Sequence, residues 1–416
     1  MTSLTGRRQT VSKFRPVIEN LESRELLSSY FISTDSQYAA LSSKKLVAGD
    51  TVLLKGGTTF HGRLYLDPTD AGNASSPVTI TSYDPKTNAA ISSSAAASAR
   101  ATISAGSGDG IFVWDTAGVT IKGLNIVGSG ATVNKGAGIN FYSDKGGTSK
   151  LSGVTIDHVD VSGFKMYGIQ LGGGVGKGGF SNIKITYSNS HDNAYGGIHT
   201  YGAFSSTSTS YTNSNVYIGY CNVYNNAGIA NQTKPYGNGI YLSDVTGATV
   251  ERSKAYYNGA NNTSGTGPEG FWAYDANAVI FQYNESHHNY SKGADGGGFD
   301  LDGGVSNSII RYNYSHDNAG FGLAMYQFSG QRKWINNAIY NNVSSNNGLH
   351  DNSVEAFLWT SGPAMYNAQI YTNTLVVNTK SEAFLSMVQS NVQASIYSNT
   401  IQIGGVVNAS RVGVSA

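Results

Sequence analysis

The sequence predicts an all-β, single-domain solenoid of about ten or more coils, built from parallel strands. The main observation is a polar residue that recurs at intervals of 26 to 33 residues, each interval containing short runs rich in β-branched residues. A fixed period of this size indicates that each unit buries its apolar face by stacking on the next. The recurring positions are Asn125, His158, Ser188, Cys221, Ser253, Asn284, Asn313, Asn342, Asn373 and Asn399.

A second polar register lies five residues downstream of the first. Equivalent residues of stacked coils lie about 4.8 Å apart. Because an Asn side chain both donates and accepts, a column of Asn can hydrogen-bond to itself. We therefore expect two buried polar columns at the turns. The second contains Gly130, Gly163, Asn193, Asn226, Asn258, Asn289, Asn318, Asn347, Asn378 and Gly404.

Composition excludes several classes of protein. The 416 residues are 13% charged with a net charge of +1, which gives no basis for a nucleic-acid partner. No apolar run reaches the length of a transmembrane helix. The single cysteine, Cys221, excludes an intrachain disulfide, and we interpret it as a small buried residue. We expect the chain to act as a monomer.

Four segments follow in order along the chain. Residues 1–29 form an export signal or a disordered basic tail, residues 30–45 a cap, residues 46–405 the solenoid, and residues 406–416 a C-terminal tail. The first segment has no apolar stretch typical of a secretory peptide. Its stretch Leu21–Leu27 resembles the LEPR-XLL type of N-terminal signal, with Ser23 where that pattern prefers Pro. This resemblance implies an extracellular or bacterial cell-surface protein.

Each coil opens with a small residue followed by an apolar one, and a second β-rich run follows within the coil. The chain resembles the right-handed parallel β-helix superfamily, the pectate-lyase-like group, in this pattern and in a first coil formed by Ala48–Leu54 and Pro77–Tyr83. The resemblance implies the fold. It leaves open whether the chain is a polysaccharide lyase, a glycoside hydrolase, an epimerase, an esterase or a non-catalytic adhesin. The openers run from Gly110-Ile111, Gly138-Ile139 and Gly168-Ile169 to Ala356-Phe357 and Ala383-Phe384.

One coil is longer than the coils before it. Ile198 and Ile240 are 42 residues apart, and the excess lies in Ala203–Asn213 and Ala227–Gly237. Loops that lengthen on a rigid solenoid commonly wall a binding face, although they are also tolerated as surface excursions.

Strand alternation predicts two outward columns on the opening strands. Their central rings, Tyr201, Tyr241, Trp272, Tyr274 and Tyr326, predict a sugar-binding face, because aromatic rings pack on the CH groups of sugars. The alternative is that long turns cover these rings. The first column contains Phe112, Asn140, Gln170, His199, Tyr241, Trp272, Asp300, Ala324 and Leu358. The second contains Trp114, Tyr142, Gly172, Tyr201, Ser243, Tyr274, Asp302, Tyr326 and Thr360.

Carboxylates cluster in the Gly-rich stretch 292–304. Asp295, Asp300 and Asp302, with Glu269 on the preceding coil, can supply oxygen ligands for Ca²⁺. They can instead serve as the acid and base of a glycosidase, or form a turn with solvated acids. In the resemblance, they look like the Ca²⁺-holding carboxylates of β-helix polysaccharide lyases.

A lyase also needs a base. Lys292, Arg332 and Lys333 are the basic residues nearest to the carboxylates in sequence, but none stands in a motif that fixes its role. His199, on the outward face, is a candidate proton donor or sugar ligand, or an ordinary surface His.

These observations predict a secreted or surface polysaccharide lyase that cleaves an acidic polysaccharide by β-elimination. Two alternatives remain open. One is a glycoside hydrolase or epimerase on the same fold, and the other is a non-catalytic solenoid that binds glycan or builds the cell surface.

Overall fold

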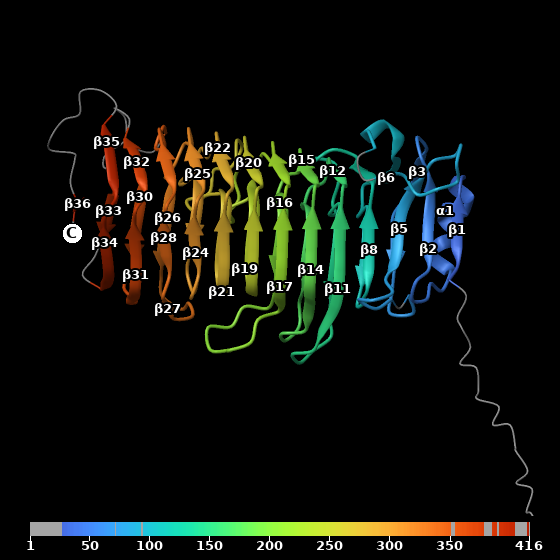
Figure 1. Ribbon diagram of the computed structural model, residues 1–416, viewed down its shortest axis with the longest axis horizontal. Helices are drawn as coiled ribbons and strands as arrows, with labels where there is room; N and C mark the ends of the chain where they lie inside the picture. Colours follow the sequence, from blue (N-terminus) through green and yellow to red (C-terminus); the bar gives the residue numbers. More distant parts are fainter. Residues whose placement is uncertain are drawn as a thin grey trace, which may run out of the picture.

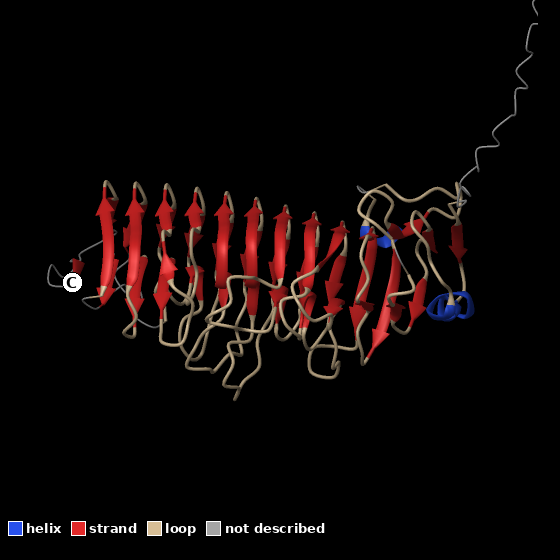
Figure 2. Cartoon of the chain, turned by 90° about the horizontal axis from the view of Figure 1, so that it is seen from below, coloured by secondary structure: helices blue, strands red, loops and turns tan. Residues whose placement is uncertain are grey.

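The computed structural model describes residues 27–70, 72–92, 95–350, 354–377, 385–388, 391–403 and 414–415. The described chain forms a right-handed β-solenoid of about 11 turns, which confirms the predicted fold class. Figure 1 shows the coils side by side along a straight rod, and Figure 2 shows the same row of strands from below, with loops projecting on one side. The signal-like stretch lies outside the described residues except for Leu27, so export stays a prediction, as do the monomeric state and the segment boundaries.

The strands form three parallel stacks, each with about one strand per coil. The first stack carries the outward columns predicted from the sequence. Its strands are β4 (Leu64–Leu66), β7 (Ile111–Trp114), β10 (Ile139–Ser143), β13 (Tyr167–Gly173), β16 (Gly196–Tyr201), the first part of β19 (Asn238–Glu251), the first part of β21 (Glu269–Gln282), β23 (Gly297–Leu301), β26 (Leu323–Gln327), β30 (Ala356–Thr360), β33 (Leu385–Val388) and β36 (Val414–Ser415).

The second stack joins the first through β19 and β21, which continue from one stack into the other without a break. Its other strands are β1 (Ser29–Ile32), β2 (Thr51–Lys55), β5 (Val78–Tyr83), β8 (Val119–Lys122), β11 (Lys150–Asp157), β14 (Gly179–Thr186), β17 (Asn213–Gly219), β24 (Ile309–Arg311), β27 (Trp334–Ile335), β28 (Ala338–Tyr340), β31 (Met365–Tyr371) and β34 (Val392–Tyr397).

The third stack is a separate sheet of 12 short strands. It consists of β3 (Thr59–His61), β6 (Ala101–Gly106), β9 (Leu124–Gly128), β12 (Asp160–Ser162), β15 (Asn189–His191), β18 (Asn222–Tyr224), β20 (Lys254–Tyr256), β22 (Glu285–His287), β25 (Tyr314–His316), β29 (Val343–Ser345), β32 (Thr374–Val377) and β35 (Thr400–Ile403).

Helix is confined to α1 (Asp35–Ala40) and two 3₁₀ turns, Leu41–Ser43 and Ala97–Ala99, in the described chain. Thr34 begins α1 with a capping box, in which its side chain accepts from the Gln37 backbone N–H. Tyr38 of α1 packs on the ring of Phe60. The helix thus covers the core at the blue end of the rod in Figure 1.

The solenoid interior is apolar because inward residues of successive coils stack on one another. In the first stack, this column is completely buried from coil to coil. Burial of apolar surface is the main stabilising contribution that each coil gains from its neighbours. The column contains Ile111, Ile139, Ile169, Ile198, Ile240, Phe271, Phe299, Leu323 and Ala356.

The predicted polar columns are present as stacked hydrogen bonds. In the second column, the Asn289 side chain donates to Asn318 Oδ1 at 3.0 Å, and Asn318 donates to Asn347 at 2.8 Å. Asn347 donates in turn to the buried Glu355 carboxylate at 2.7 Å. In the first column, Asn313 donates to Asn342 at 3.0 Å. The predicted column members Asn378 and Gly404, and the coil opener Ala383-Phe384, lie outside the described residues.

The first polar column differs from the sequence prediction at its N-terminal end. Val159, rather than His158, lies next to Ser188, because the Val159 N–H donates to Ser188 Oγ. Asn125 pairs with Asp160 in the strand, so it is also one residue away from the column. His158 instead adopts a left-handed turn conformation with φ 52°. The uneven intervals between coils concealed this shift of one residue.

The second polar column shows the same shift. Phe164, rather than Gly163, lies next to Asn193, because the Phe164 N–H donates to Asn193 Oδ1 at 3.1 Å. Gly163 adopts the left-handed conformation with φ 81°, as Asp192 does before Asn193. The prediction for Gly163 is therefore wrong by one residue.

Candidate functional site

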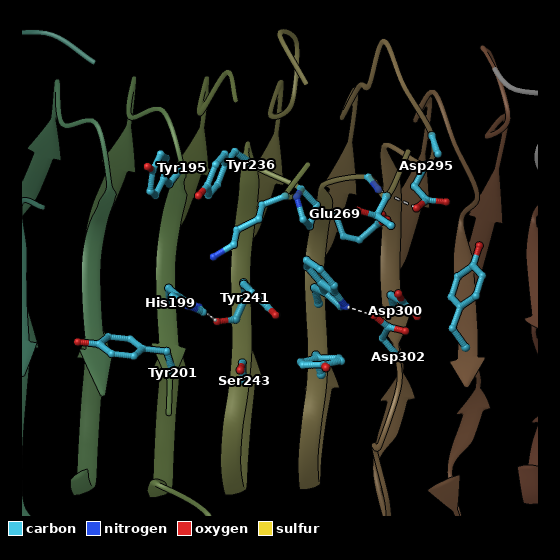
Figure 3. Close-up of a pocket in the computed structure, with 18 of the residues that line it drawn as sticks. Tyr195, His199, Tyr201, Tyr236, Tyr241, Ser243, Glu269, Asp295, Asp300 and Asp302 are labelled. Carbon is cyan, nitrogen blue, oxygen red and sulfur yellow. Dashed lines mark hydrogen bonds between the residues drawn. The ribbon is translucent and has the colours of Figure 1, made fainter. Parts of the chain in front are cut away.

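A groove of about 1100 Å³ crosses the outer face of the first stack. It extends from Gln170 on β13 to Trp359 on β30, and strands β16, β19, β21, β23 and β26 form its floor. Figure 3 shows side chains of successive strands lying side by side along this floor. Residues far apart in sequence therefore share one site.

The two floor columns follow the predicted register through most coils. His199 pairs with Tyr241, Tyr241 with Trp272, and Trp272 with Asp300. The prediction is wrong in the last coil, where Phe357 and Trp359 take the places assigned to Leu358 and Thr360. Leu358 is completely buried. Ala356, not Phe357, occupies the inward apolar position there, which shifts the alternation by one residue.

All five rings predicted to bind sugar line the groove, and each of them contacts at least one other aromatic ring or His199. The Trp272 and Tyr241 rings stack with centroids 4.1 Å apart, and Trp272 is only 8% exposed. Tyr326 packs against Trp359 at the far end. Trp272 therefore lies on the outward face, as the alternation predicts, but little of its surface is exposed. The five rings are Tyr201, Tyr241, Trp272, Tyr274 and Tyr326.

Four carboxyl side chains line one part of the groove, as Figure 3 shows. Glu269, Asp300 and Asp302 are 2%, 3% and 7% exposed. Asp302 accepts from Trp272 Nε1 at 3.0 Å and from the Gly303 N–H at 2.6 Å. Glu269 accepts from the Gly297 N–H at 2.7 Å, and Asp295 accepts from the Gly267 N–H at 2.9 Å.

Burial controls the protonation of these groups. It raises the pKa of Glu269 and of Asp300 well above the ordinary values, and neighbouring carboxyl groups add to the shift. Burial also raises the pKa of Asp302 to about 7, although the hydrogen bonds from Gly303 and Trp272 oppose it. Asp300 Oδ1 is buried and makes no hydrogen bond to the described protein atoms. At neutral pH this part of the groove holds both protonated and ionised carboxyl groups.

The predicted Ca²⁺ ligands do not meet closely enough to form a cage. Among the described residues, three donor side chains approach within 4.8 Å of one another at a turn outside the groove, and the four groove carboxyl groups do not. Ca²⁺ takes six to eight oxygen ligands at about 2.3–2.6 Å. The present arrangement therefore does not fit Ca²⁺, and Ca²⁺ binding at Asp295, Asp300, Asp302 and Glu269 stays a prediction.

His199 lies among aromatic rings on the groove floor. Its ring stacks between Tyr167 and Tyr241, with centroid distances of 4.3 and 4.5 Å. Its Nδ1 lies 3.1 Å from the Tyr241 carbonyl oxygen, an acceptor, so Nδ1 carries the proton and Nε2 has a free lone pair. Burial lowers the pKa of His199 to about 4. At neutral pH it can accept a proton or a hydrogen bond through Nε2.

The three basic residues proposed as a lyase base do not line the groove. Arg332 is buried, with Nε 2.5 Å from Asp275 and its guanidinium over the Tyr211 ring. Lys292 is exposed, and Lys333 is exposed beside the ring of Tyr366. Their positions in the sequence could not predict where their side chains point, because each residue follows a turn. We therefore do not assign the base role to any of them.

The two long loops around the groove have different roles. Ala227–Gly237 supplies Lys234, Pro235 and Tyr236 to the groove wall. In Ala203–Asn213, the backbone carbonyls of Ser208 and Ser210 accept from Arg332 at 2.7 and 3.1 Å. The loop Ala227–Gly237 is thus a wall, and the loop Ala203–Asn213 is fastened to the solenoid by a buried cation.

Several aromatic side chains of the groove wall were not predicted from the sequence. Tyr167, the first residue of β13, lines the groove together with Tyr195 and Tyr236, which lie just before β16 and β19. The rings of Tyr195 and Tyr236 stack with centroids 3.8 Å apart. Each of the three residues stands immediately before a Gly, at or next to the start of a first-stack strand. A Tyr-Gly pair recurring in three successive coils is the signal that could have found them.

Comparisons with known proteins support the fold. No protein-family model matches the chain, and no curated protein matches it by sequence. The A-module of the Azotobacter vinelandii mannuronan C-5 epimerase AlgE4 aligns with a TM-score of 0.55 and 15% identity, covering 91% of this chain and 96% of that one. This likeness shows that the chain has the parallel β-helix fold.

Two further solved β-helix structures resemble the chain. A lacto-N-biosidase from Eubacterium ramulus aligns with a TM-score of 0.50 and 15% identity, covering 90% of this chain and 68% of that one. An alginate lyase from a Paenibacillus species aligns with a TM-score of 0.46 and 17% identity, covering 92% and 99%. At these identities the likeness shows the fold alone. Separately, none of the helices in the described segments has the length and hydropathy to cross a bilayer.

Proposed function

We propose that the groove is the active site of an enzyme that hydrolyses glycosidic bonds in a carbohydrate chain. The observation that carries this proposal is the combination of buried carboxyl groups with an aromatic floor, formed by Asp300 and Asp302 beside Trp272 and Tyr241. Aromatic rings pack on sugar CH groups, while carboxyl groups bind hydroxyls and transfer protons. By their names, the epimerase and the biosidase also act on carbohydrates.

The charge of the groove favours a neutral substrate. Among the residues described as lining it, Lys234 is the single Lys or Arg, whereas Glu269, Asp295, Asp300 and Asp302 are acidic. A uronate chain would bring a further carboxylate close to Asp302, which is ionised above pH 7, and like charges at short range repel. The excess of acidic over basic residues in the groove supports hydrolysis of a neutral glycan over the lyase reaction predicted from the sequence.

Asp300 and Asp302 suit the two roles that glycosidic hydrolysis requires. Asp300, with its raised pKa, donates its proton to the leaving oxygen as the bond to the anomeric carbon breaks. Asp302, ionised above pH 7 and held by Trp272, either attacks that carbon or takes a proton from the attacking water. Asp300 lies on β23 and Asp302 directly follows the end of that strand, so their Cα atoms lie about 7 Å apart by strand rise.

A second candidate function rests on His199. A neutral imidazole with a free Nε2, packed between tyrosine rings, is suited to abstract the proton that β-elimination or epimerisation of a uronate removes. The protonated carboxyl groups of Glu269 and Asp300 could then donate hydrogen bonds to the substrate carboxylate. In this reading the substrate is an acidic polysaccharide.

One assay separates these candidates. Purified protein is incubated with neutral glycans and with uronate polymers, in CaCl₂ and in EGTA, while reducing ends and the ultraviolet absorbance of unsaturated uronates are followed. The proposal predicts new reducing ends from a neutral glycan, without unsaturated product, that disappear in Asp300→Asn and persist in Lys333→Ala. Unsaturated product would favour the second candidate. Glycan binding without any turnover would favour a non-catalytic protein.

A further inference from the structure

Three potential metal ligands from two adjacent coils converge at a turn of the third stack. His288 follows β22, and His316 and Asp317 lie at the end of β25. One donor atom from each lies within 4.8 Å of the other two. His316 Nδ1 is 2.7 Å from Asp317 Oδ2. None of the three lines the groove.

The register of the solenoid brings these side chains together. His287 pairs with His316 between the two strands, so the next residues, His288 and Asp317, also stack. Both have φ 54°, the left-handed turn conformation of this column. Nδ1 of His287 lies 2.9 Å from Nδ1 of His288, which helps to fix the exposed ring of His288. The site is therefore partly preorganised.

A second carboxylate supports the orientation of His316. Its Nε2 lies 3.3 Å from Glu285 Oε1, while Glu285 Oε2 is paired with Lys254 at 2.7 Å. An imidazole that donates its Nε2 proton to a carboxylate presents an unprotonated Nδ1 to a metal, and such an outer carboxylate is a regular feature of protein metal sites.

We propose that His288, His316 and Asp317 bind a divalent transition-metal ion of the zinc class. Two imidazoles and one carboxylate suit such an ion, whereas Ca²⁺ and Mg²⁺ prefer oxygen ligands alone. Three protein ligands leave a fourth position for water. The site is distinct from the groove and does not depend on the function proposed for it.

The same turn in a coil nearer the N-terminus provides a control within the protein. There His191 Nδ1 lies 2.6 Å from Asp192 and His191 Nε2 lies 3.1 Å from Asp160, as in the proposed site. The place of His288 is taken by Gly163, which offers no side-chain ligand. The two turns thus differ chiefly in the second imidazole.

The test is metal binding by untagged full-length protein freed of metal with EDTA. Zn²⁺ is titrated by calorimetry, and Co²⁺ is added separately to record its visible absorption. We expect one Zn²⁺ per chain at this site and a Co²⁺ spectrum typical of nitrogen and oxygen ligands. His288→Asn, which tolerates the left-handed conformation, and Asp317→Asn should each weaken binding about tenfold or more. His191→Asn should leave it unchanged.

Three results would overturn the proposal. The first is the absence of Zn²⁺ binding by protein whose circular dichroism shows the native fold. The second is Zn²⁺ affinity that is unchanged in both His288→Asn and Asp317→Asn. Loss of binding in His191→Asn instead would place the ion elsewhere and would also contradict it.

Discussion

The indole Nε1 of Trp272 donates a 3.0 Å hydrogen bond to Asp302 Oδ2 on the next coil. This bond links the aromatic floor of the groove to its carboxyl groups. Because it stabilises the ionised carboxylate, it holds the pKa of Asp302 lower than burial alone would.

Trp272→Phe should therefore raise the pKa of Asp302 above its value of about 7. If Asp302 acts as a carboxylate, the acidic limb of the profile of kcat/KM against pH should move to higher pH. Tyr274→Phe, which leaves the bond between Trp272 and Asp302 in place, serves as control. An unchanged acidic limb in Trp272→Phe would argue against a catalytic carboxylate at Asp302.

Asp300→Asn should lower kcat about 10²- to 10⁴-fold, the usual contribution of a general acid. The amide has nearly the same shape and carries no charge, so the fold should be retained. Turnover is measured with the best glycan substrate and the melting temperature by calorimetry. Full activity in this variant would exclude Asp300 as the acid.

Stability should fall as the pH rises above 6.5. Glu269, Asp300 and Asp302 have raised pKa values in the folded protein, so above the ordinary carboxyl pKa the unfolded chain binds fewer protons than the native one. For each of these groups that stays protonated in the folded protein, the free energy of unfolding falls by about 1.4 kcal/mol per pH unit. The prediction applies only above pH 6.5. Below that pH the unfolded chain protonates His199, whose folded pKa is about 4, and this makes stability rise with pH.

The measurement is the free energy of unfolding by denaturant between pH 6.5 and 8. Asp300→Asn should reduce the slope of stability against pH, while Lys333→Ala should leave it unaltered. A stability that is flat or rises over this interval in the unmodified protein would contradict the protonated state inferred for these carboxyl groups.

Arg332→Met should destabilise the fold by about 3–5 kcal/mol, because it leaves buried Asp275 without its cation. Lys333→Met, next to it and exposed, should change stability by less than about 0.5 kcal/mol. Chemical denaturation measures both. Equal effects of the two substitutions would contradict the structural role given to Arg332.

Asn318→Ala should lower the free energy of unfolding by about 3 kcal/mol or more. Asn318 Oδ1 accepts from both the backbone and the side chain of Asn289, and its own amide donates to Asn347. Removing it leaves buried polar groups without partners. Asn261→Ala, at an exposed position, is the control. A melting temperature that is equal in the two variants would show that the polar column contributes little.

Much of the fold could be predicted because the period of the solenoid converts sequence spacing into spatial neighbours. The spacing placed His199, Tyr241, Trp272 and Asp300 in one row, and the structure has them paired in that order. The same reasoning failed at Leu358, where a coil opens with Ala356 followed by two apolar residues and the inward position is ambiguous.

The turns account for the rest of what could not be predicted. Tyr195, Tyr236 and Lys234 reach the groove from turns, whose backbone does not follow the alternation of a strand. Arg332 follows a turn as well, and its direction is set by Asp275, a residue 57 positions earlier. Such long-range ion pairs leave no periodic signal in the sequence.

The most direct test of the groove as a carbohydrate site is calorimetric titration of a neutral oligosaccharide substrate into the Asp300→Asn protein. The account predicts one site per chain, with affinity that falls at least tenfold when Tyr201→Ala or Tyr326→Ala is added and stays the same when Lys333→Ala is added. Absence of glycan binding, or binding indifferent to both groove substitutions, would contradict it.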